Sequence, residues 1–421
     1  MSYNNKDEIV QLETEFNELN ISDRNPNFNH EYCYKLKGDK LWCKECVPYY
    51  AIEGWTSGNN EIDEFIKDTI YNAKNNYFYN GKFYPKFLEW VPFDRFEDIN
   101  QIGEGGFAKV YSATWIDGKT KYKRHDGKYL NEIKILWNFY LNETSDTYLK
   151  FYEITKDDKT KEFMMIMQLV NQGNLRSVLS SNFNNIVWIE KLLVLHNILY
   201  DLKDLHKLGY FHKDFHSGNI LLNRKEEPDK NLSYVSDFGL SGPSNEHKSD
   251  NKTCGVLSYI SPEVLNGEPY SLSSDIYSFG IIIAELSSGR SPFYNRKHDY
   301  SLALEICNGI RPEFGKGTPE IYKKLAYRCM SAIPNQRPTA KEENFGYKGK
   351  EIKATFDEAN KEIPNISTSH EKNPDAVYTS RVFTFSSNLP KPINSSIITS
   401  YLDEDNKDCQ DFKLFDLEVS S

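Results

Sequence analysis

The residues from Tyr210 to Leu222 limit the fold of this chain more than any other stretch. Here a polar loop carries Asp214 five positions before Asn219, and the apolar residues that begin at Ile220 follow directly. This pattern predicts a loop attached to a buried strand. A carboxylate and an amide so spaced suit phosphoryl transfer, in which one group takes or orients the proton of the acceptor hydroxyl and another holds Mg²⁺.

Composition and charge narrow the class of protein. The chain has 421 residues, of which 39% are hydrophobic and 27% are charged, so it is long enough for two or three folded domains. Its net charge of −10 argues against a nucleic-acid groove as the main function, because phosphate backbones are bound by basic surfaces. We find no N-terminal targeting pattern and no apolar run long enough to span a membrane. Seven scattered cysteines suit a reducing compartment, so we expect a soluble cytoplasmic protein without a membrane partner.

Near the N-terminus, four residues have the spacing of a metal site. They form two pairs, each three positions apart: His30 with Cys33, and Cys43 with Cys46. One imidazole and three thiolates can bind a structural Zn²⁺ tetrahedrally. The alternative is three free thiols beside a chance histidine, and the spacing alone does not decide between the two.

The sequence around this cluster divides into three parts. Residues 1–29 are polar and Asn-rich, so we expect them to be disordered. The Cys-containing extension covers residues 30–86 and includes a capped amphipathic helix within residues 57–75. The Tyr- and Asn-rich residues 76–86 are expected to be a connector.

A glycine-rich segment follows the extension. Gly103 and Gly105 would let the backbone lie close over phosphates, where a Cβ atom would clash. Ile102 before them and Val110 in the next strand are the apolar residues expected to contact an adenine ring. Ala108 stands where a third glycine would complete the usual pattern. A glycine-rich loop alone is weak evidence for nucleotide binding, so its meaning depends on the motifs that follow.

Several further motifs follow in an order that is typical of one family. Between about residues 95 and 340 the chain carries the glycine-rich loop, Glu132 on a predicted helix, the loop with Asp214 and Asn219, Asp237-Phe238-Gly239, Ser261-Pro262-Glu263, Asp275 and Arg337. This series resembles the eukaryotic protein kinases, whose catalytic loop is H-R-D-x-x-x-x-N. The overall likeness is to the tyrosine-kinase-like group of serine/threonine kinases.

The resemblance implies a bilobal α+β fold. A small β-rich N-lobe would cover residues 95–170 and a mostly helical C-lobe residues 171–345. Residues 346–421 are polar, and we expect them to form a disordered tail in which residues 351–363 could form one helix. Ser, Asn and Pro cluster from Thr379 to Ser421.

The resemblance also implies roles for individual residues. Asp214 would be the catalytic base, and Asn219 and Asp237 would hold the Mg²⁺ that accompanies ATP. Met167 would line the back of the adenine pocket, with residues 168–170, including Gln168 and Val170, as its hinge.

Two charged groups of the C-lobe are expected to be structural. Asp275 would hydrogen-bond the backbone of the catalytic loop, and Arg337 would pair with Glu263.

One part of the family pattern is missing. Glu132 should pair with a lysine on a preceding strand of the type V-A-I-K, but the interval after Val110 is short and polar. Lys119, Lys121 and Lys123 could project from one face of a rudimentary strand, and we favour Lys121 as the substitute. The alternative is a solvated hairpin without a phosphate-binding lysine.

Three hypotheses for function therefore stay open. The first is an active kinase that transfers the γ-phosphoryl group of ATP to serine or threonine in a protein. The second is a pseudokinase that binds signalling partners on a kinase-shaped surface. The third is a gene model that skips an exon, so that the strand is missing only from the inferred sequence.

Two residues of the loop also depart from the family pattern. Lys213 stands in place of the usual arginine, which puts control by phosphorylation of the activation segment in doubt. His216 stands where many serine/threonine kinases have lysine, which puts the acceptor specificity in doubt.

Overall fold

The structure is a computed structural model. It describes residues 55–71, 75–79, 82–85, 87–88, 90–104, 109–116, 129–142, 148–224, 231–243, 253–340, 350–368, 371–384 and 389–408. The chain divides into two compact units, Met1–Val91 and Pro92–Ser421.

The first unit contains the predicted helix and a hairpin. Helix α3 (Asn60–Tyr71) starts where the Asn59 side chain accepts hydrogen bonds from the backbone of the first turn. Its buried face is closed by Leu88, whose amide donates to Thr69. The expected connector instead forms an antiparallel pair of strands, β1 (Asn75–Tyr79) and β2 (Lys82–Pro85). Tyr and Phe, which are frequent in this segment, favour strands.

The second unit begins with a β-rich region that contains one helix. Its described elements are β3 (Phe96–Glu104), β4 (Lys109–Trp115), α4 (Tyr129–Asn142), β5 (Phe151–Lys156) and β6 (Phe163–Met167). Strand β3 pairs with β4, and β5 pairs with β6, both antiparallel. The predicted β-rich N-lobe is therefore present in the described part of this region.

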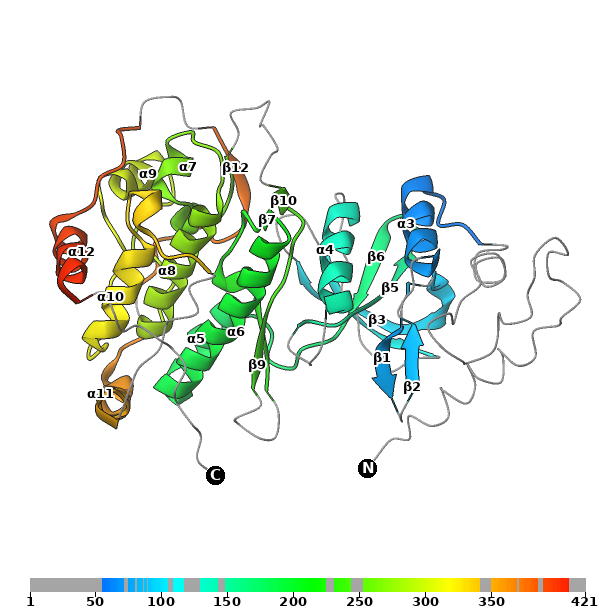
Figure 1. The fold of residues 1–421 in the computed structure, drawn as a ribbon, viewed down its shortest axis with the longest axis horizontal. Coiled ribbons are helices and arrows are strands. Elements are labelled where there is room, and N and C mark those ends of the chain that lie inside the picture. The colour runs from blue at the N-terminus through cyan, green and yellow to red at the C-terminus, as the bar shows by residue number, and fades with distance from the viewer. Residues whose placement is uncertain are drawn as a thin grey trace, which may run out of the picture. The chain divides into compact units, whose positions relative to one another are not determined.

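The rest of this unit is mostly helical. Its helices are α5 (Leu175–Asn182), α6 (Trp188–Lys207), α7 (Pro262–Leu265), α8 (Leu272–Ser288), α9 (Tyr300–Cys307) and α10 (Glu320–Cys329). Helix α8 is the centre of the core, because it is buried from Ser274 to Ser288 and packs against α6 and α10 (Figure 1). The predicted bilobal α+β fold is thus confirmed. None of the helices in the described ranges has both the length and the apolar character needed to cross a bilayer.

Short strand pairs carry the loops of the helical lobe. Strands β8 (Ile220–Asn223) and β9 (Leu232–Val235) form an antiparallel hairpin. Strands β7 (Tyr210–Phe211) and β10 (Gly242–Pro243), which lie on either side of this hairpin in the chain, form a separate antiparallel pair. Each of these strands adjoins one of the motifs found in the sequence.

The C-terminal segment differs from the sequence-based expectation. Residues 346–421 were expected to form a disordered tail with one helix at residues 351–363. Helix α11 (Lys350–Glu362) agrees with that helix, but the described parts also contain β12 (Arg381–Phe383) and α12 (Ser396–Asp408), which were not expected. These elements lie at three separate places on the helical lobe (Figure 1). Phe356 of α11 packs on Trp188, with ring centroids 5.5 Å apart, and Tyr401 of α12 stacks on Tyr327 at 4.8 Å. Phe356 and Tyr401 are isolated apolar residues in a polar sequence, and each packs on an aromatic side chain of the helical lobe.

Candidate active site

The backbone of the loop around Asp214 is hydrogen-bonded to a buried carboxylate. Asp275, at the start of α8, accepts hydrogen bonds from the backbone amides of His212 (2.9 Å) and Lys213 (3.1 Å). It also contacts the His206 ring at 3.0 Å. Only 2% of Asp275 is exposed, so this charge depends on these partners. The predicted contact between Asp275 and the loop backbone is confirmed.

Two residues of this region have left-handed backbone conformations. Both Lys213 and Asp237 have φ near 66°, although neither is glycine. Such conformations cost of order 1–3 kcal/mol and persist where surrounding contacts hold them. The amide of Lys213 is one of the groups held by Asp275, and Asp237 precedes the buried Phe238. The backbone strain therefore lies at Asp237 itself and at Lys213, the residue directly before Asp214.

The Asp214 side chain is buried and faces polar partners. Its Oδ2 accepts a hydrogen bond from the Ser380 hydroxyl, and its Oδ1 lies 3.5 Å from His216 Nε2. Burial acts to raise the pKa of Asp214, but the nearby His216 and the Ser380 hydroxyl hold it below its usual value. The carboxylate is therefore ionised at neutral pH and can accept a proton or a hydrogen bond.

Asn219 and Asp237 are brought together by the hairpin β8–β9. Ile220 pairs with Val235 in the register of this hairpin, and the Ser236 amide donates to the Asn219 carbonyl at 2.9 Å. The Asn219 side-chain nitrogen donates to the carbonyl of Asp214 at 3.0 Å, so this bond does not use the side-chain oxygen. An amide oxygen and a carboxylate are suitable Mg²⁺ ligands, so the donor set fits the expected metal.

Glu132 joins α4 to this site. It is 2% exposed, and its carboxylate accepts a hydrogen bond from the amide of Phe238 at 3.2 Å. The Phe238 ring packs edge-to-face on Phe139 of the same helix and lies 5.3 Å from the His212 ring. Helix α4 and the catalytic loop are thus packed through one aromatic side chain.

The residues predicted to bind the nucleotide are described only in part. Gly103 pairs with Val110 between β3 and β4, and a Cβ atom at Gly103 would lie 3.6 Å from the Val110 side chain. Ile102 is 53% exposed, whereas Met167, at the end of β6, is buried. Residues 168–170 follow β6 as a half-buried connector, and the Gln168 amide donates to the Lys150 carbonyl at 2.8 Å. Their role as a hinge stays a prediction.

Four of the candidate residues from the glycine loop and the lysine run lie outside the described residues: Gly105, Lys119, Lys121 and Lys123. The choice of Lys121 as the phosphate-binding lysine therefore stays a prediction.

The second predicted charge pair is present and buried. Both terminal nitrogens of Arg337 donate to the Glu263 carboxylate, at 2.7 and 2.6 Å. Burial acts to raise the pKa of Glu263, but the hydrogen bonds and the charge of Arg337 hold it below its usual value. The pair connects the segment after β11 (Thr253–Gly255) to the end of the helical lobe, and this prediction is confirmed.

Sequence reasoning missed part of the acceptor side of the site. His216 was noted only as a departure from a pattern, but its Nδ1 accepts from the Gly218 amide at 3.0 Å. Since Nδ1 is the acceptor in this bond, we assign the ring proton to Nε2, the nitrogen that faces Asp214 and Ser380. Arg176 of α5 lies 3.3 Å from the same ring. No sequence pattern places Arg176 or Ser380 at this site, because each is far along the chain from Asp214.

The comparison with protein families agrees with this geometry. The family model described as the protein kinase domain matches residues 96–344, more than half of the chain. The chain belongs to the protein kinase domain family.

Curated relatives of this kinase domain include proteins of Dictyostelium discoideum. The probable serine/threonine-protein kinase mkcE is 30% identical over 57% of this chain and 34% of its own length. The probable serine/threonine-protein kinase kinX is 28% identical over 63% of this chain and 24% of its own length. A probable LIM domain-containing serine/threonine-protein kinase is 29% identical over 46% of this chain and 29% of its own length. The matched kinase region thus spans about a third or less of each relative, and these relatives do not single out the tyrosine-kinase-like group.

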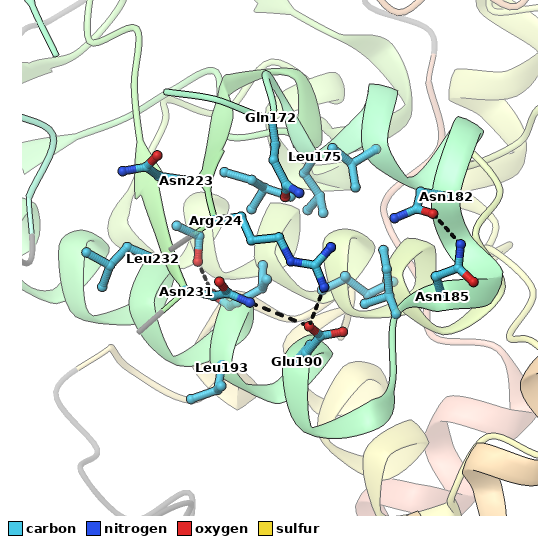
Figure 2. A pocket seen from close by; sticks show the side chains of 16 residues that line it. Gln172, Leu175, Asn182, Asn185, Glu190, Leu193, Asn223, Arg224, Asn231 and Leu232 are labelled. Atoms are coloured by element: carbon cyan, nitrogen blue, oxygen red, sulfur yellow. Dashed lines mark hydrogen bonds and ion pairs between the residues drawn. The ribbon is translucent and has the colours of Figure 1, made fainter. Parts of the chain in front are cut away.

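A pocket of the kinase domain lies apart from these residues. It opens between α5, α6 and the hairpin β8–β9, and Figure 2 shows Glu190 at one side of it, in contact with Arg224 and Asn231. None of the predicted catalytic or metal-binding side chains lines it. The pocket therefore does not belong to the candidate active site.

The predicted zinc ligands are not part of the described structure. His30, Cys33, Cys43 and Cys46 lie outside the described residues, so the zinc site stays a prediction. Among the described residues, no group of three or more His, Cys, Asp or Glu side chains is arranged to hold a metal ion. The described cysteines Cys254, Cys307 and Cys329 are free thiols.

Proposed function

We propose that this chain transfers the γ-phosphoryl group of ATP to a serine or threonine hydroxyl of a protein. The observation that carries the proposal is the ionised carboxylate of Asp214, which accepts a hydrogen bond from a serine hydroxyl. This is the chemical group that a protein acceptor would present. Curated relatives are probable serine/threonine kinases, which supports the same acceptor class.

Each residue of the site has a role in this proposal. Asp214 orients the acceptor hydroxyl and takes its proton. Asn219 and Asp237 would hold Mg²⁺, which supplies positive charge to the phosphate oxygens when bound. Ile102, Val110 and Met167 would contact the adenine ring, while Glu132 keeps α4 packed against the Asp237-Phe238-Gly239 segment through its bond to the Phe238 amide.

The test combines nucleotide binding with phosphotransfer. We expect ATP with Mg²⁺ to raise the melting temperature of the wild-type chain, and the chain to phosphorylate a generic basic protein. Asp214→Asn should still bind ATP but lose phosphotransfer by roughly 10²–10⁴-fold, the usual contribution of a positioned base. No transfer and no stabilisation by ATP in the wild type would contradict the proposal and favour the scaffold hypothesis.

The lysine needs its own comparison within this test. If Lys121 binds phosphate, Lys121→Met should weaken ATP binding and transfer, while Lys119→Met and Lys123→Met leave both nearly unchanged. These two neighbours are matched controls because they belong to the same polar run. Equal effects from all three substitutions would mean that the run acts only through its overall charge.

A further inference from the structure

The C-terminal segment adds a strand to the region that follows the Asp-Phe-Gly motif. Strand β12 (Arg381–Phe383) pairs antiparallel with β11 (Thr253–Gly255), so that Gly255 lies opposite Arg381 and Thr253 opposite Phe383. Extended peptides commonly bind proteins by adding a strand to an exposed edge in this way. The pairing places the residue just before β12 next to Gly255, where a β-carbon would lie 3.3 Å from an Asp214 carboxylate oxygen.

That residue is Ser380, and its hydroxyl is oriented for reaction. The hydroxyl donates to Asp214 Oδ2, while its oxygen lies 3.4 Å from His216 Nε2. Since the His216 proton is assigned to Nε2, the serine oxygen accepts from the imidazole and its own proton points to Asp214. A base acts only when it lies within hydrogen-bond reach of the proton that it takes, and Ser380 meets this condition.

Side chains on both sides of Ser380 fix its register. Tyr378 is buried, its hydroxyl donates to the Pro292 carbonyl at 2.9 Å, and its own carbonyl accepts from Arg176 at 2.9 Å. On the other side, Phe383 is buried and Arg381 donates to the His298 carbonyl. A shift by one residue would withdraw both aromatic side chains from their sites.

The segment is also tied to the lobe at both ends. On its N-terminal side α11 packs on Trp188, and on its C-terminal side Ile398 of α12 is completely buried. A segment held in this way reaches its site as an intramolecular ligand at a high effective concentration. Other peptides therefore have to displace it.

We propose that residues 377–383 occupy the protein-substrate site of their own chain, and that Ser380 is a site of autophosphorylation in cis. The proposal rests on the kinase activity proposed above and names one acceptor for it. In the reaction, the Ser380 oxygen bonds to the γ-phosphorus of ATP and the bond from that phosphorus to the β,γ-bridging oxygen breaks. ADP leaves with the bonding electrons, and the hydroxyl proton passes to Asp214.

The first experiment locates the phosphate and determines the reaction order. The full chain is incubated with ATP and Mg²⁺ over a hundredfold range of protein concentration, and phosphopeptides are identified by mass spectrometry. We expect phosphate on Ser380 at a first-order rate that does not change with dilution. Ser380→Ala should lose that phosphopeptide, as should Asp214→Asn, whereas Thr379→Ala, which removes the exposed neighbouring hydroxyl, should keep it.

A second experiment measures occupancy without any turnover. A labelled synthetic peptide of residues 374–384 is titrated into the wild type and into a Tyr378→Ala, Phe383→Ala double variant, and binding is followed by fluorescence anisotropy. We expect at least tenfold tighter binding to the double variant, whose own segment has lost both anchors. Val382→Ala should behave like the wild type, because 51% of Val382 is exposed.

The outcomes separate this inference from the proposed function. Transfer to an external protein without phosphate on Ser380 would overturn the inference and leave the kinase activity standing. A rate on Ser380 that rises in proportion to protein concentration would overturn the assignment in cis. Equal peptide binding to the wild type and the double variant would show that the segment does not occupy the site. Failure to phosphorylate any acceptor would overturn the activity itself.

Discussion

The helical lobe and the strand β3 differ in which side chains they bury: the lobe buries charged groups, whereas β3 leaves apolar side chains exposed. In the helical lobe, Asp275 and the pair Glu263–Arg337 are buried and satisfied by several hydrogen bonds. In β3, by contrast, residues 97–102 are exposed, and Ile102 is one of the most exposed large apolar side chains described. The acceptor side of the site is therefore assembled by contacts within the chain. On β3, which we predict to cover the nucleotide, apolar surface remains exposed.

The largest effect on this comparison should come from Arg337. Arg337→Gln leaves the buried Glu263 carboxylate without its partner, so we expect a loss of roughly 3–5 kcal/mol in the free energy of unfolding, measured with denaturant. The control is Lys316→Gln, which removes an exposed ion pair with Glu362 and should cost about 0–1 kcal/mol. Equal losses at the two sites would contradict a special role for burial.

A second variant tests the exception within the helical lobe. Lys191 of α6 is fully buried between the rings of Phe183 and Trp188, and its ammonium has no hydrogen-bond partner among the described residues. Burial lowers its pKa to about 7. Between this pH and the ordinary lysine pKa the unfolded chain binds more protons, so the stability contribution of this group rises with pH.

Lys191→Met should therefore stabilise the chain most at acidic pH. We expect its advantage over the wild type to shrink by roughly 3 kcal/mol between pH 6.5 and 9.5, because the wild type gains about 1.4 kcal/mol of stability for each pH unit above the folded-state pKa of Lys191. Lys207→Met is the control on the same helix, because the Lys207 side chain is 51% exposed, and it should show little trend with pH. Parallel pH profiles of Lys191→Met and the wild type would refute the explanation.

The smallest effect on stability should come from Ile102. Ile102→Ala removes an exposed side chain, so we expect a change within about 0.5 kcal/mol in the free energy of unfolding. The Michaelis constant for ATP should rise several-fold, since the nucleotide would otherwise cover this apolar surface. Ile99→Ala, in the same strand, should leave the Michaelis constant unchanged. A large loss of stability in Ile102→Ala would mean that the strand is not the exposed element described here.

Most of the fold and the centre of the site could be predicted from the sequence. The motif with Asp214 and Asn219, the Asp237-Phe238-Gly239 turn and helix α8 are local patterns, and each carries its residue types at fixed spacing. Asp275 and the pair of Glu263 with Arg337 were also anticipated, because buried charges require partners and the family resemblance names them. Local pattern failed at residues 76–86, where a hairpin replaces the expected connector.

The C-terminal segment shows what could not be predicted from the sequence. By itself the sequence determined a kinase-like catalytic loop and a polar tail, since Tyr378 and Phe383 are too few to define a core. Tertiary structure alone decided that these two side chains are buried on the helical lobe, and that β12, which ends at Phe383, pairs with β11. The hydroxyl of Ser380 contacts Asp214, which lies 166 positions earlier in the chain, only because the folded helical lobe brings the two residues together. Contacts at such separation leave no periodic pattern in the sequence.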